Sequence, residues 1–504
     1  MLDSVTDLLN KQESGELTAV DLAQESIRRI QASQPTHNAY THINSEAALQ
    51  AAEDIDRRRG AGENLGSLAG VPIAIKDVLC TKDAPTTCSS NMLREFRPPY
   101  DATVVQKLRA ADAVIVGKTN MDEFAMGAST ETSAFGVTRN PWDTSCTPGG
   151  SSGGSAACVA AGTVPLSLGT DTGGSIRQPS AFCGVTGIKP TYGRVSRFGL
   201  VAFASSLDQV GPIGWSVEDC ARLLQVISGY EPRDSTSLAR EVPQFSEVIS
   251  SNDLRGIRIG VLRSSLESDG VQDSVRDALI ESIEVFRGQG ADIVDIDLPH
   301  RDYWVPTYYV IAPCEASSNL SRFDGAHYGH RTSDLQEEVL QAKSNSNDAD
   351  RGAGPLVTTY CRSRAEGFGA EVKRRIMIGT YALSSGYVSK YYNQALKVRR
   401  LIREDYDAAF SQVDLLLGPV TPTPAFKLGD KIDDPIQMYL CDLFTVGANL
   451  AGVPAMSLPA GRDPQGLPVG IQLQAPALQE SRMIFAGAAF QSITDHHTQR
   501  PESL

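Results

Sequence analysis

The feature that most constrains the fold of this chain is an alternation between short β-branched apolar runs and segments with helical periodicity. Each apolar run has the length of a buried strand, and the helical segments between them are long enough to cover a sheet. The predicted strands cover residues 71–75, 113–117, 164–168, 257–262, 292–296, 413–417, 455–458 and 468–473. The predicted helices of this pattern cover residues 102–109, 152–161, 273–287 and 480–492. The alternation predicts an α/β fold, with a large mixed or mainly parallel sheet covered by helices on both faces.

Two parts of the chain depart from this alternation and are predicted to be helical. Residues 1–60 are expected to form helices, one starting after the N-cap residue Thr18 and another over 45–59. Residues 301–410 are expected to form a mostly helical insertion, with a polar stretch at 343–355 predicted as an exposed loop. Because strands occur on both sides of the insertion, we predict a single domain. Its segments are the N-terminal helices at 1–60, the core at 61–300, the insertion at 301–410 and the return to the core at 411–504.

Composition and charge exclude several classes of protein. The chain has 504 residues, of which 41% are hydrophobic and 21% are charged, so global disorder is excluded. Lys and Arg number 46 against 60 Asp and Glu, and a net charge of −14 is poorly suited to holding a nucleic acid alone. There is no apolar run of about 18 residues and no signal-peptide pattern, so we expect no membrane contact and a cytoplasmic location. The nine cysteines are scattered and odd in number, which argues against a disulfide framework or a metal site.

Glycine and serine concentrate in two segments, 147–155 and 169–177, which lie among the predicted strands. A flexible linker is one interpretation, but linkers do not sit between buried strands. A phosphate-binding loop is a second, but neither segment has the lysine of a P-loop or the glycine pattern of a dinucleotide site. The third is a serine nucleophile in a loop whose closely spaced backbone N–H groups could stabilise an oxyanion, and this interpretation fits best.

A serine nucleophile needs a base, and Lys76 is the strongest candidate. None of the seven histidines lies between positions 43 and 299, which include both glycine-serine segments. Lys76 directly follows the apolar run 71–75, where burial would lower its pKa and let it accept a proton near neutral pH. The alternative is a solvated lysine, or one paired with the neighbouring Asp77.

Taken together, these segments resemble the amidase signature family. The matching segments, in the order of the family, are Gly70–Asp77, Gly149–Ser155 and Gly169–Arg177. The resemblance implies the amidase signature fold and a Ser–cis-Ser–Lys triad. In this triad Ser175 is the nucleophile, Ser151 is the bridging serine after a cis peptide bond from Gly150, and Lys76 is the base. Ser152 is the neighbouring alternative to Ser151.

The resemblance also assigns roles around the nucleophile. A proton is expected to pass from Ser175 through Ser151 to a neutral Lys76 while Ser175 attacks an amide carbonyl. Asp171 and Arg177 are expected to form an ion pair that shapes the nucleophile loop. The backbone N–H groups expected to stabilise the oxyanion are those of Thr172, Gly173, Gly174 and Ser175.

Further segments narrow the resemblance to the glutaminase (A) subunits of the tRNA-dependent amidotransferases. These segments are 121–127, 130–136, 308–312, 315–325, 366–369, 371–376 and 433–435, and the resemblance covers nearly the whole chain. It implies that the chain hydrolyses glutamine and passes ammonia to a B subunit within a heterotrimer, in which a small C subunit wraps the other two. The B subunit would bind the tRNA, Glu-tRNA(Gln) or Asp-tRNA(Asn), and use ATP and magnesium. No cofactor is expected in this chain.

Glutamine is a zwitterion, so its pocket must neutralise an α-carboxylate and an α-ammonium. By resemblance, Arg375 is expected to bind the carboxylate bidentately and Asp442 to bind the ammonium. Tyr308 is expected at the pocket wall, with the adjacent Tyr309 as the alternative, and Ser129 is expected to contact the substrate. Judged from the residues alone, Arg375 could instead be a solvated member of a basic cluster and Asp442 a carboxylate on a helix surface.

Two other functions remain open at this point. A stand-alone amidase would act on another small amide and would need no partner. A non-catalytic scaffold is disfavoured because Lys76, Ser151 and Ser175 are all present.

Overall fold

The computed structural model describes residues 3–249, 251–266, 270–333 and 355–502. The strands are β1 (Tyr40–Ile43), β2 (Pro72–Lys76), β3 (Val114–Thr119), β4 (Leu166–Asp171), β5 (Thr186–Lys189), β6 (Gln209–Gly214), β7 (Arg258–Leu262), β8 (Asp292–Ile296), β9 (Leu415–Pro419), β10 (Ala455–Arg462) and β11 (Pro468–Gln474). The α-helices are α1 (Val5–Glu13), α2 (Ala19–His37), α3 (Ser45–Gly60), α4 (Thr103–Ala110), α5 (Gly153–Ala160), α6 (Arg177–Cys183), α7 (Val217–Ile227), α8 (Arg263–Leu266), α9 (Asp273–Gly288), α10 (Trp304–Asn319), α12 (Pro355–Gly367), α13 (Ala370–Leu383), α14 (Tyr392–Gln412), α15 (Pro435–Leu440), α16 (Val446–Ala451) and α17 (Glu480–Ile493). Single turns of 3-10 helix are η1 (Asn91–Leu93), η2 (Glu123–Ala125), η3 (Arg301–Tyr303), η4 (Leu320–Arg322) and η5 (His496–Thr498).

The strands form a single mixed sheet in the order β1-β3-β2-β4-β6-β5-β10-β11-β9-β7-β8. Two parallel groups, β3-β2-β4 and β9-β7-β8, lie on either side of an antiparallel centre. Antiparallel pairing joins β4 to β6, β6 to β5, β5 to β10, β10 to β11 and β11 to β9. The predicted mixed α/β sheet is therefore confirmed, whereas the variant with mainly parallel strands is wrong.

Every strand predicted from an apolar run is present, and the ends are displaced by at most a few residues. Three strands escaped prediction: β1, β5 and β6. Strands β1 and β5 have only four residues each, and β6 reads Gln-Val-Gly-Pro-Ile-Gly, so glycine and proline break its β-branched pattern. Strands β5 and β6 form part of the antiparallel centre. Because they were not predicted, the antiparallel character of the sheet was not predicted either.

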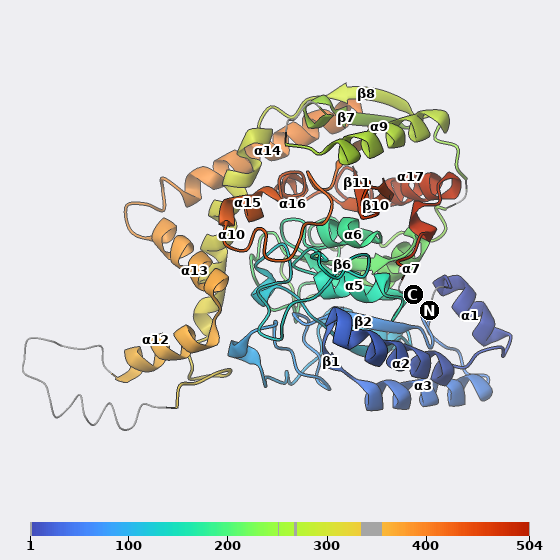
Figure 1. The fold of residues 1–504 in the computed structure, drawn as a ribbon, viewed down its shortest axis with the longest axis horizontal. Coiled ribbons are helices and arrows are strands. Elements are labelled where there is room, and N and C mark those ends of the chain that lie inside the picture. The colour runs from blue at the N-terminus through green and yellow to red at the C-terminus, as the bar shows by residue number, and fades with distance from the viewer. Residues whose placement is uncertain (1–2, 250, 267–269, 334–354, 503–504) are drawn as a thin grey trace, which may run out of the picture.

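The predicted helices are present as well. Thr18 begins α2 with a capping box: its hydroxyl accepts from the backbone N–H of Asp21, and the Asp21 carboxylate accepts from the backbone N–H of Thr18. The predicted helical insertion contains α10, α12, α13 and α14, and α10 packs against both α13 and α14. These four helices lie on the left and upper left of the view in Figure 1. The polar loop predicted over 343–355 lies outside the described residues, except for its last position, where α12 begins.

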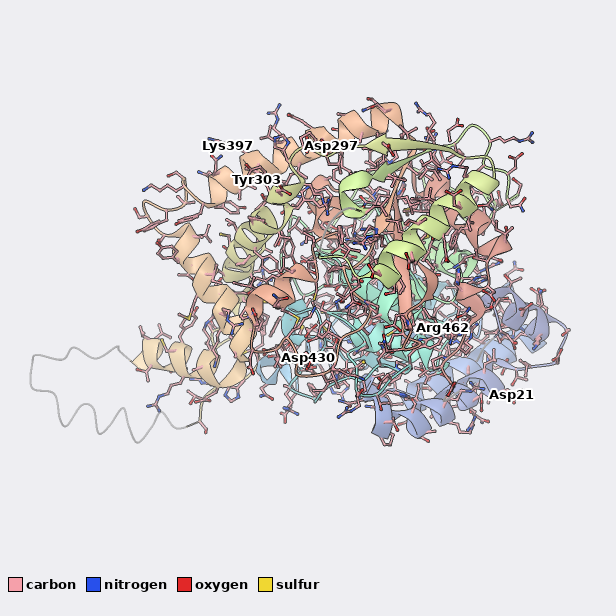
Figure 2. The ribbon with its side chains drawn as sticks, turned by 45° about the horizontal axis from the view of Figure 1, so that its top comes forward. Asp21, Asp297, Tyr303, Lys397, Asp430 and Arg462 are labelled. Atoms are coloured by element: carbon pink, nitrogen blue, oxygen red, sulfur yellow. The ribbon has the colours of Figure 1, made fainter. Side chains whose placement is uncertain are left out.

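Two neighbouring parallel strands, β2 and β4, end in ionisable residues that lie in the interior of the protein. Lys76 is the last residue of β2, and Asp171 is the last residue of β4, the parallel neighbour of β2. Strands β2 and β4 are buried over their whole length. By contrast, Figure 2 shows charged side chains such as Asp21, Lys397 and Arg462 on the outside of the molecule, where they are exposed. The side chains at the ends of β2 and β4 are therefore ionisable groups held in the interior.

Among the helices that the structure describes, none is long and apolar enough to cross a membrane. Within the same ranges, no group of His, Cys, Asp and Glu side chains has the arrangement of a metal site. All nine cysteines are free thiols.

Candidate active site

Lys76 lies in a fully buried polar site at the end of β2. Its Nζ donates to the hydroxyls of Ser151 at 2.7 Å, Ser152 at 2.8 Å and Thr170 at 2.9 Å. Burial lowers the pKa of Lys76 to about 7, although the carboxylates of Asp122 and others act in the opposite direction. A lysine in this environment is neutral in a substantial fraction of molecules at pH 7. A neutral amine has two N–H donors and one lone pair, so it can accept a proton from one of the three hydroxyls.

The alternative interpretation of Lys76 does not hold. Lys76 is not solvated, and the neighbouring Asp77 is paired with Lys118, whose Nζ lies 3.3 Å from Asp77 Oδ1. Asp77 also accepts hydrogen bonds from the backbone N–H and the hydroxyl of Thr87. The negative charge next to Lys76 in the sequence is thus already neutralised by another residue.

Ser151 stands in the first glycine-serine segment, shortly before α5. The peptide bond between Gly150 and Ser151 is cis, as the resemblance implies. Asp122 lies beside this bond: its backbone N–H donates to the carbonyl of Ser151 at 3.3 Å, and a Cβ on Gly150 would lie 2.0 Å from Asp122 Oδ2. The N–H of Gly150 donates to Gln178 Oε1 at 2.8 Å. Ser151 is therefore held between α6 and the segment that precedes η2.

Ser175 stands in the second glycine-serine segment, between β4 and α6, and is 9% exposed. The backbone N–H of Ser152 donates to the carbonyl of Ser175 at 3.1 Å, so the two glycine-serine segments lie against each other. Among the hydrogen bonds of the described residues, none joins the hydroxyls of Ser151 and Ser175. The Ser175 hydroxyl is accordingly available to rotate toward either a substrate or Ser151.

Asp171 and Arg177 form the expected ion pair beneath the nucleophile loop. Arg177 donates from Nε to Asp171 Oδ2 at 3.0 Å and from Nη2 to Oδ1 at 3.1 Å, and both side chains are fully buried. Burial alone would raise the pKa of Asp171, but the charge of Arg177 and a hydrogen bond from Asn449 outweigh it and hold the pKa at about 2. The same carboxylate accepts the backbone N–H groups of Gly174 at 2.9 Å and Ile176 at 3.3 Å. The ion pair thereby fixes the course of the loop.

The nucleophile loop presents fewer unpaired N–H groups than expected. The Gly174 N–H is engaged by Asp171, whereas the N–H groups of Gly173 and Ser175 have no acceptor in the described part of the chain. The Thr172 hydroxyl donates to Asp208 at 2.8 Å. Gly174 has a φ of +140°, and a Cβ there would lie 2.3 Å from Thr445 Oγ1, so only glycine fits.

The structure brings the predicted substrate residues together from three distant segments. Arg375 on α13 is 3% exposed, so it is not a solvated member of its basic cluster. Asp442 lies between α15 and α16 rather than on a helix surface, and Oδ2 accepts from the hydroxyl of Tyr309 at 2.7 Å. Burial raises the pKa of Asp442 to about 7, although Tyr309 and Arg375 act to lower it. A cation entering beside Asp442 would favour its ionised form.

The two adjacent tyrosines of α10 contact different parts of the site. Tyr308 lies against the nucleophile loop, because a Cβ on Gly173 would be 2.6 Å from Tyr308 Cζ. Tyr309 stacks on Tyr439, with 3.8 Å between the ring centroids, and lies 5.3 Å from the guanidinium of Arg375. Burial raises the pKa of both Tyr308 and Tyr309 far above its usual range, so both hydroxyls stay protonated.

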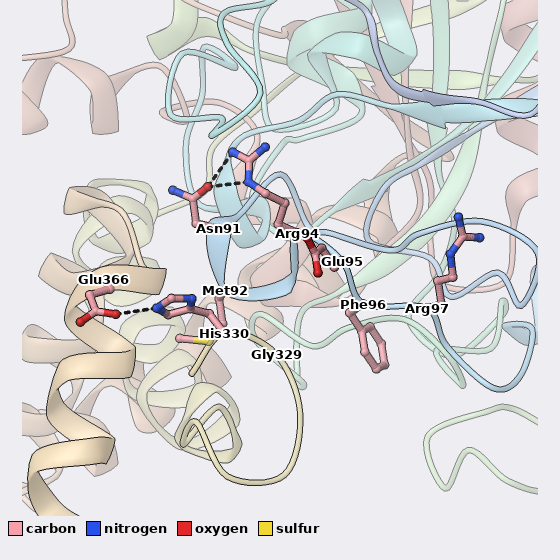
Figure 3. A pocket seen from close by; sticks show the side chains of 9 residues that line it. All are labelled: Asn91, Met92, Arg94, Glu95, Phe96, Arg97, Gly329, His330 and Glu366. Carbon is pink, nitrogen blue, oxygen red and sulfur yellow. Dashed lines mark hydrogen bonds and ion pairs between the residues drawn. The ribbon is translucent and has the colours of Figure 1, made fainter. Parts of the chain in front are cut away.

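A cavity of about 210 Å³ opens between η2, α13 and α15. Its lining residues include Ser129, Glu123, Glu371 and Tyr439; Glu371 contacts Arg375, and Tyr439 contacts Tyr309. The volume suits a small amide substrate. A second cavity of about 670 Å³ lies along η1, where His330 Nε2 and Glu366 Oε2 are 2.6 Å apart (Figure 3), and it includes none of the predicted site residues.

Several residues of the site were not predicted. Thr170, Asp122 and Thr445 contact the catalytic segments, and Glu371 and Tyr439 contact Arg375 or its neighbours. Asp122 and Glu371 stand in segments that resemble the family, so their positions carried a signal. Thr445 carried none, because its hydrogen bond to the Gly173 carbonyl at 2.6 Å spans 272 residues of sequence.

Comparisons with known proteins identify the family of this chain. The family model described as Amidase matches residues 21–484. A curated protein of Rhodopirellula baltica, named as the A subunit of glutamyl-tRNA(Gln) amidotransferase, is 68% identical over 504 residues, which cover 100% of this chain and 99% of the relative. A crystal structure of the Thermotoga maritima protein of the same name is 38% identical, with a TM-score of 0.77 over 97% of this chain and 98% of that one. The native peptide amidase from Stenotrophomonas maltophilia is 31% identical, with a TM-score of 0.78 over 99% and 98% of the two chains. This chain belongs to the amidase family.

Proposed function

We propose that this chain is the glutamine-hydrolysing A subunit of a tRNA-dependent amidotransferase. The observation that carries the proposal is that a buried guanidinium, Arg375, and a half-buried carboxylate, Asp442, both contact the same side chain, Tyr309. A zwitterionic amide needs a cation for its carboxylate and an anion for its ammonium, whereas the amide group of a peptide or an aryl amide needs neither partner. The relative from Rhodopirellula baltica carries the same functional name over its full length, which supports the proposal.

The chemistry begins with Ser175 as the nucleophile. Ser175 Oγ attacks the side-chain amide carbon of glutamine while its proton passes to Ser151 Oγ, whose own proton passes to the lone pair of Lys76 Nζ. The 2.7 Å contact between Lys76 and Ser151 supports the second transfer. The first transfer requires the Ser175 hydroxyl to rotate toward Ser151.

The tetrahedral oxyanion is stabilised by backbone N–H groups of the loop 172–175. Gly173 and Ser175 have N–H groups without an acceptor in the described residues, so they are the principal donors, with Thr172 beside them. Gly174 would contribute only if its N–H left Asp171. The proton then returns through Ser151 to the leaving nitrogen, and ammonia departs. Water enters, loses a proton to the same relay and releases glutamate from the acyl-enzyme.

The ammonia is consumed by the partner subunits of a heterotrimer. A B subunit, using ATP and magnesium, activates the misacylated Glu-tRNA(Gln) or Asp-tRNA(Asn), and a C subunit wraps the pair. The net charge of −14 supports a division of labour in which the tRNA is bound mainly by the B subunit. No cofactor is assigned to this chain, and the complex would work in the cytoplasm.

Ammonia release tests the proposal. The purified chain is assayed with glutamine, alone and with its co-expressed partners, and Ser175→Ala serves as the blank. Release that depends on Ser175 and rises with the partners is expected. If glutamine gives no ammonia under either condition while another small amide is hydrolysed through Ser175, the chain is a stand-alone amidase.

The relay is tested separately. Ser151→Ala removes the bridging hydroxyl, and we expect kcat to fall by about 100-fold or more. Retention of nearly full activity would contradict the relay. Ser152→Ala is the matched comparison, because Ser152 also contacts Lys76 but is not assigned to the proton path.

A further inference from the structure

The guanidinium of Arg375 makes one hydrogen bond within the described residues and is surrounded by three aromatic rings. Its Nε donates to Glu371 Oε1 at 2.8 Å, one helical turn earlier on α13. The rings of Phe203, Tyr309 and Tyr439 lie 5.6, 5.3 and 5.5 Å from its central carbon. Within the described residues, its two terminal nitrogens make no hydrogen bond. The contacts therefore restrict the side chain while leaving its bidentate end unused.

Glu371 has both carboxylate oxygens engaged. Oε1 accepts from Arg375 and from the hydroxyl of Tyr439 at 3.3 Å, and Oε2 is paired with Arg374. Its side chain is 14% exposed and lines the 210 Å³ cavity. A carboxylate with this many partners has little freedom to move.

Two cations compensate the charge of the Glu371 carboxylate. Arg374 and Arg375 both pair with it, so Glu371 is not left as an isolated negative charge that would repel a second carboxylate approaching Arg375. A guanidinium that donates through Nε to one carboxylate can still bind a second carboxylate through both terminal nitrogens.

We propose that Glu371 is a positioning residue that fixes the orientation of Arg375, so that its two terminal nitrogens bind the α-carboxylate of the substrate. The proposal rests on the proposed function, because it takes glutamine as the substrate. It assigns to Glu371 a role in substrate selection through Arg375 and no contact with the reacting atoms. The rival role is a direct ion pair between Glu371 and the α-ammonium of glutamine.

Three variants and one matched control test the proposal in the complete complex. Glu371→Ala removes the orienting contact, Glu371→Asp keeps the charge but shortens its reach, and Glu371→Gln keeps an oxygen that can accept from Arg375 Nε. Glu404→Ala is the control, because it removes a similar helical pair with Arg400 at 2.9 Å on α14. The melting temperature of each variant reports whether it is folded.

The substrates are glutamine and 4-aminobutanamide, which is glutamine without its α-carboxylate. We expect Glu371→Ala and Glu371→Asp to raise KM for glutamine about tenfold with kcat within about twofold of wild type, as lost ground-state orientation would. Glu371→Gln should stay within about threefold of wild type in KM, because the hydrogen bond is kept. With 4-aminobutanamide, kcat/KM should be the same in all variants. Glu404→Ala should match the wild type with both substrates.

Several outcomes would overturn the proposal. An unchanged KM for glutamine in Glu371→Ala would remove the positioning role. An equal loss with both substrates would assign Glu371 to the ammonium, and a Gln variant as impaired as the Ala variant would assign it a purely electrostatic role. If Glu371→Ala does not fold, the Asp variant decides. A wild-type complex that releases no ammonia from glutamine would refute the proposed function and the positioning role together, whereas an active wild type with unaffected variants refutes the positioning role alone.

Discussion

The pH dependence of turnover follows from the burial of Lys76. Three hydroxyls surround its Nζ, and burial lowers its pKa to about 7. The relay needs the neutral amine, so activity should rise with pH through this value. For a pKa of 7 the neutral fraction is about one tenth at pH 6 and about nine tenths at pH 8, which predicts a roughly tenfold rise in kcat.

The assay must separate Lys76 from Asp442, whose pKa is also about 7. Deprotonation of either group would raise kcat/KM as the pH increases, because the relay needs neutral Lys76 and the binding of an ammonium needs ionised Asp442. In the enzyme saturated with glutamine, Asp442 is paired with the substrate, so the limb in kcat reports Lys76. Ammonia release is therefore measured at saturating glutamine from pH 5.5 to about 8.5, a range set by the neutral-fraction argument.

A perturbation of Asp122 sharpens the test. The negative charge of Asp122 raises the pKa of Lys76, so Asp122→Asn should lower it further and move the kcat limb to lower pH. A kcat that does not change between pH 6 and 8 in the wild type would show that Lys76 is not the base that titrates in turnover. A limb that moves to higher pH in Asp122→Asn would refute the assigned cause.

Three further predictions concern single residues. Arg375→Ala should raise KM for glutamine about 50-fold, because a buried, charge-assisted hydrogen-bond pair is lost. Initial rates over a range of glutamine concentrations measure KM. An unchanged KM would show that the carboxylate binds elsewhere. Gly173→Ala should lower kcat/KM at least about tenfold, because its Cβ would lie 2.6 Å from Tyr308, whereas Gly418→Ala, whose Cβ meets nothing within 4 Å, should behave as wild type. Burial raises the pKa of Glu123 to about 7. The neutral form of Glu123 therefore stabilises the folded protein. This contribution is fully present below about pH 4.5 and is lost as the pH rises through 7. The free energy of unfolding of Glu123→Gln should therefore improve relative to wild type by about 2 kcal/mol between pH 5 and 8 in urea titrations, and a pH-independent difference would contradict this.

The parts of the fold that could be predicted are those whose signal is local. The strand that ends in Lys76 is a continuous apolar run, and the capping box of Thr18 is contained in four residues. Strands β5 and β6 carry glycine, and β6 also carries proline, so they are held by their neighbours in the sheet rather than by their own propensity. Their antiparallel pairing could not be read from the chain.

The same distinction applies to the site. Lys76 and the two serine segments could be identified from the sequence because each lies in a short motif of characteristic composition. The contacts that give Arg375 and Asp442 their environment come from distant segments: Tyr439 is 68 residues from Glu371, and Tyr309 is 133 residues from Asp442. No local pattern indicates which side chains will meet across such separations. Burial, which sets the pKa of Asp442, depends on the same distant packing.

If Ser175 is the nucleophile, an acyl-enzyme forms on its hydroxyl during turnover and can be trapped. The complex is quenched in acid during glutamine turnover, digested and analysed by peptide mass mapping. A glutamyl ester is expected on Ser175, and it should be absent from Ser175→Ala and from samples quenched before glutamine is added. A glutamyl group on Ser151, Ser152 or a cysteine, or ammonia release that persists in Ser175→Ala, would contradict it.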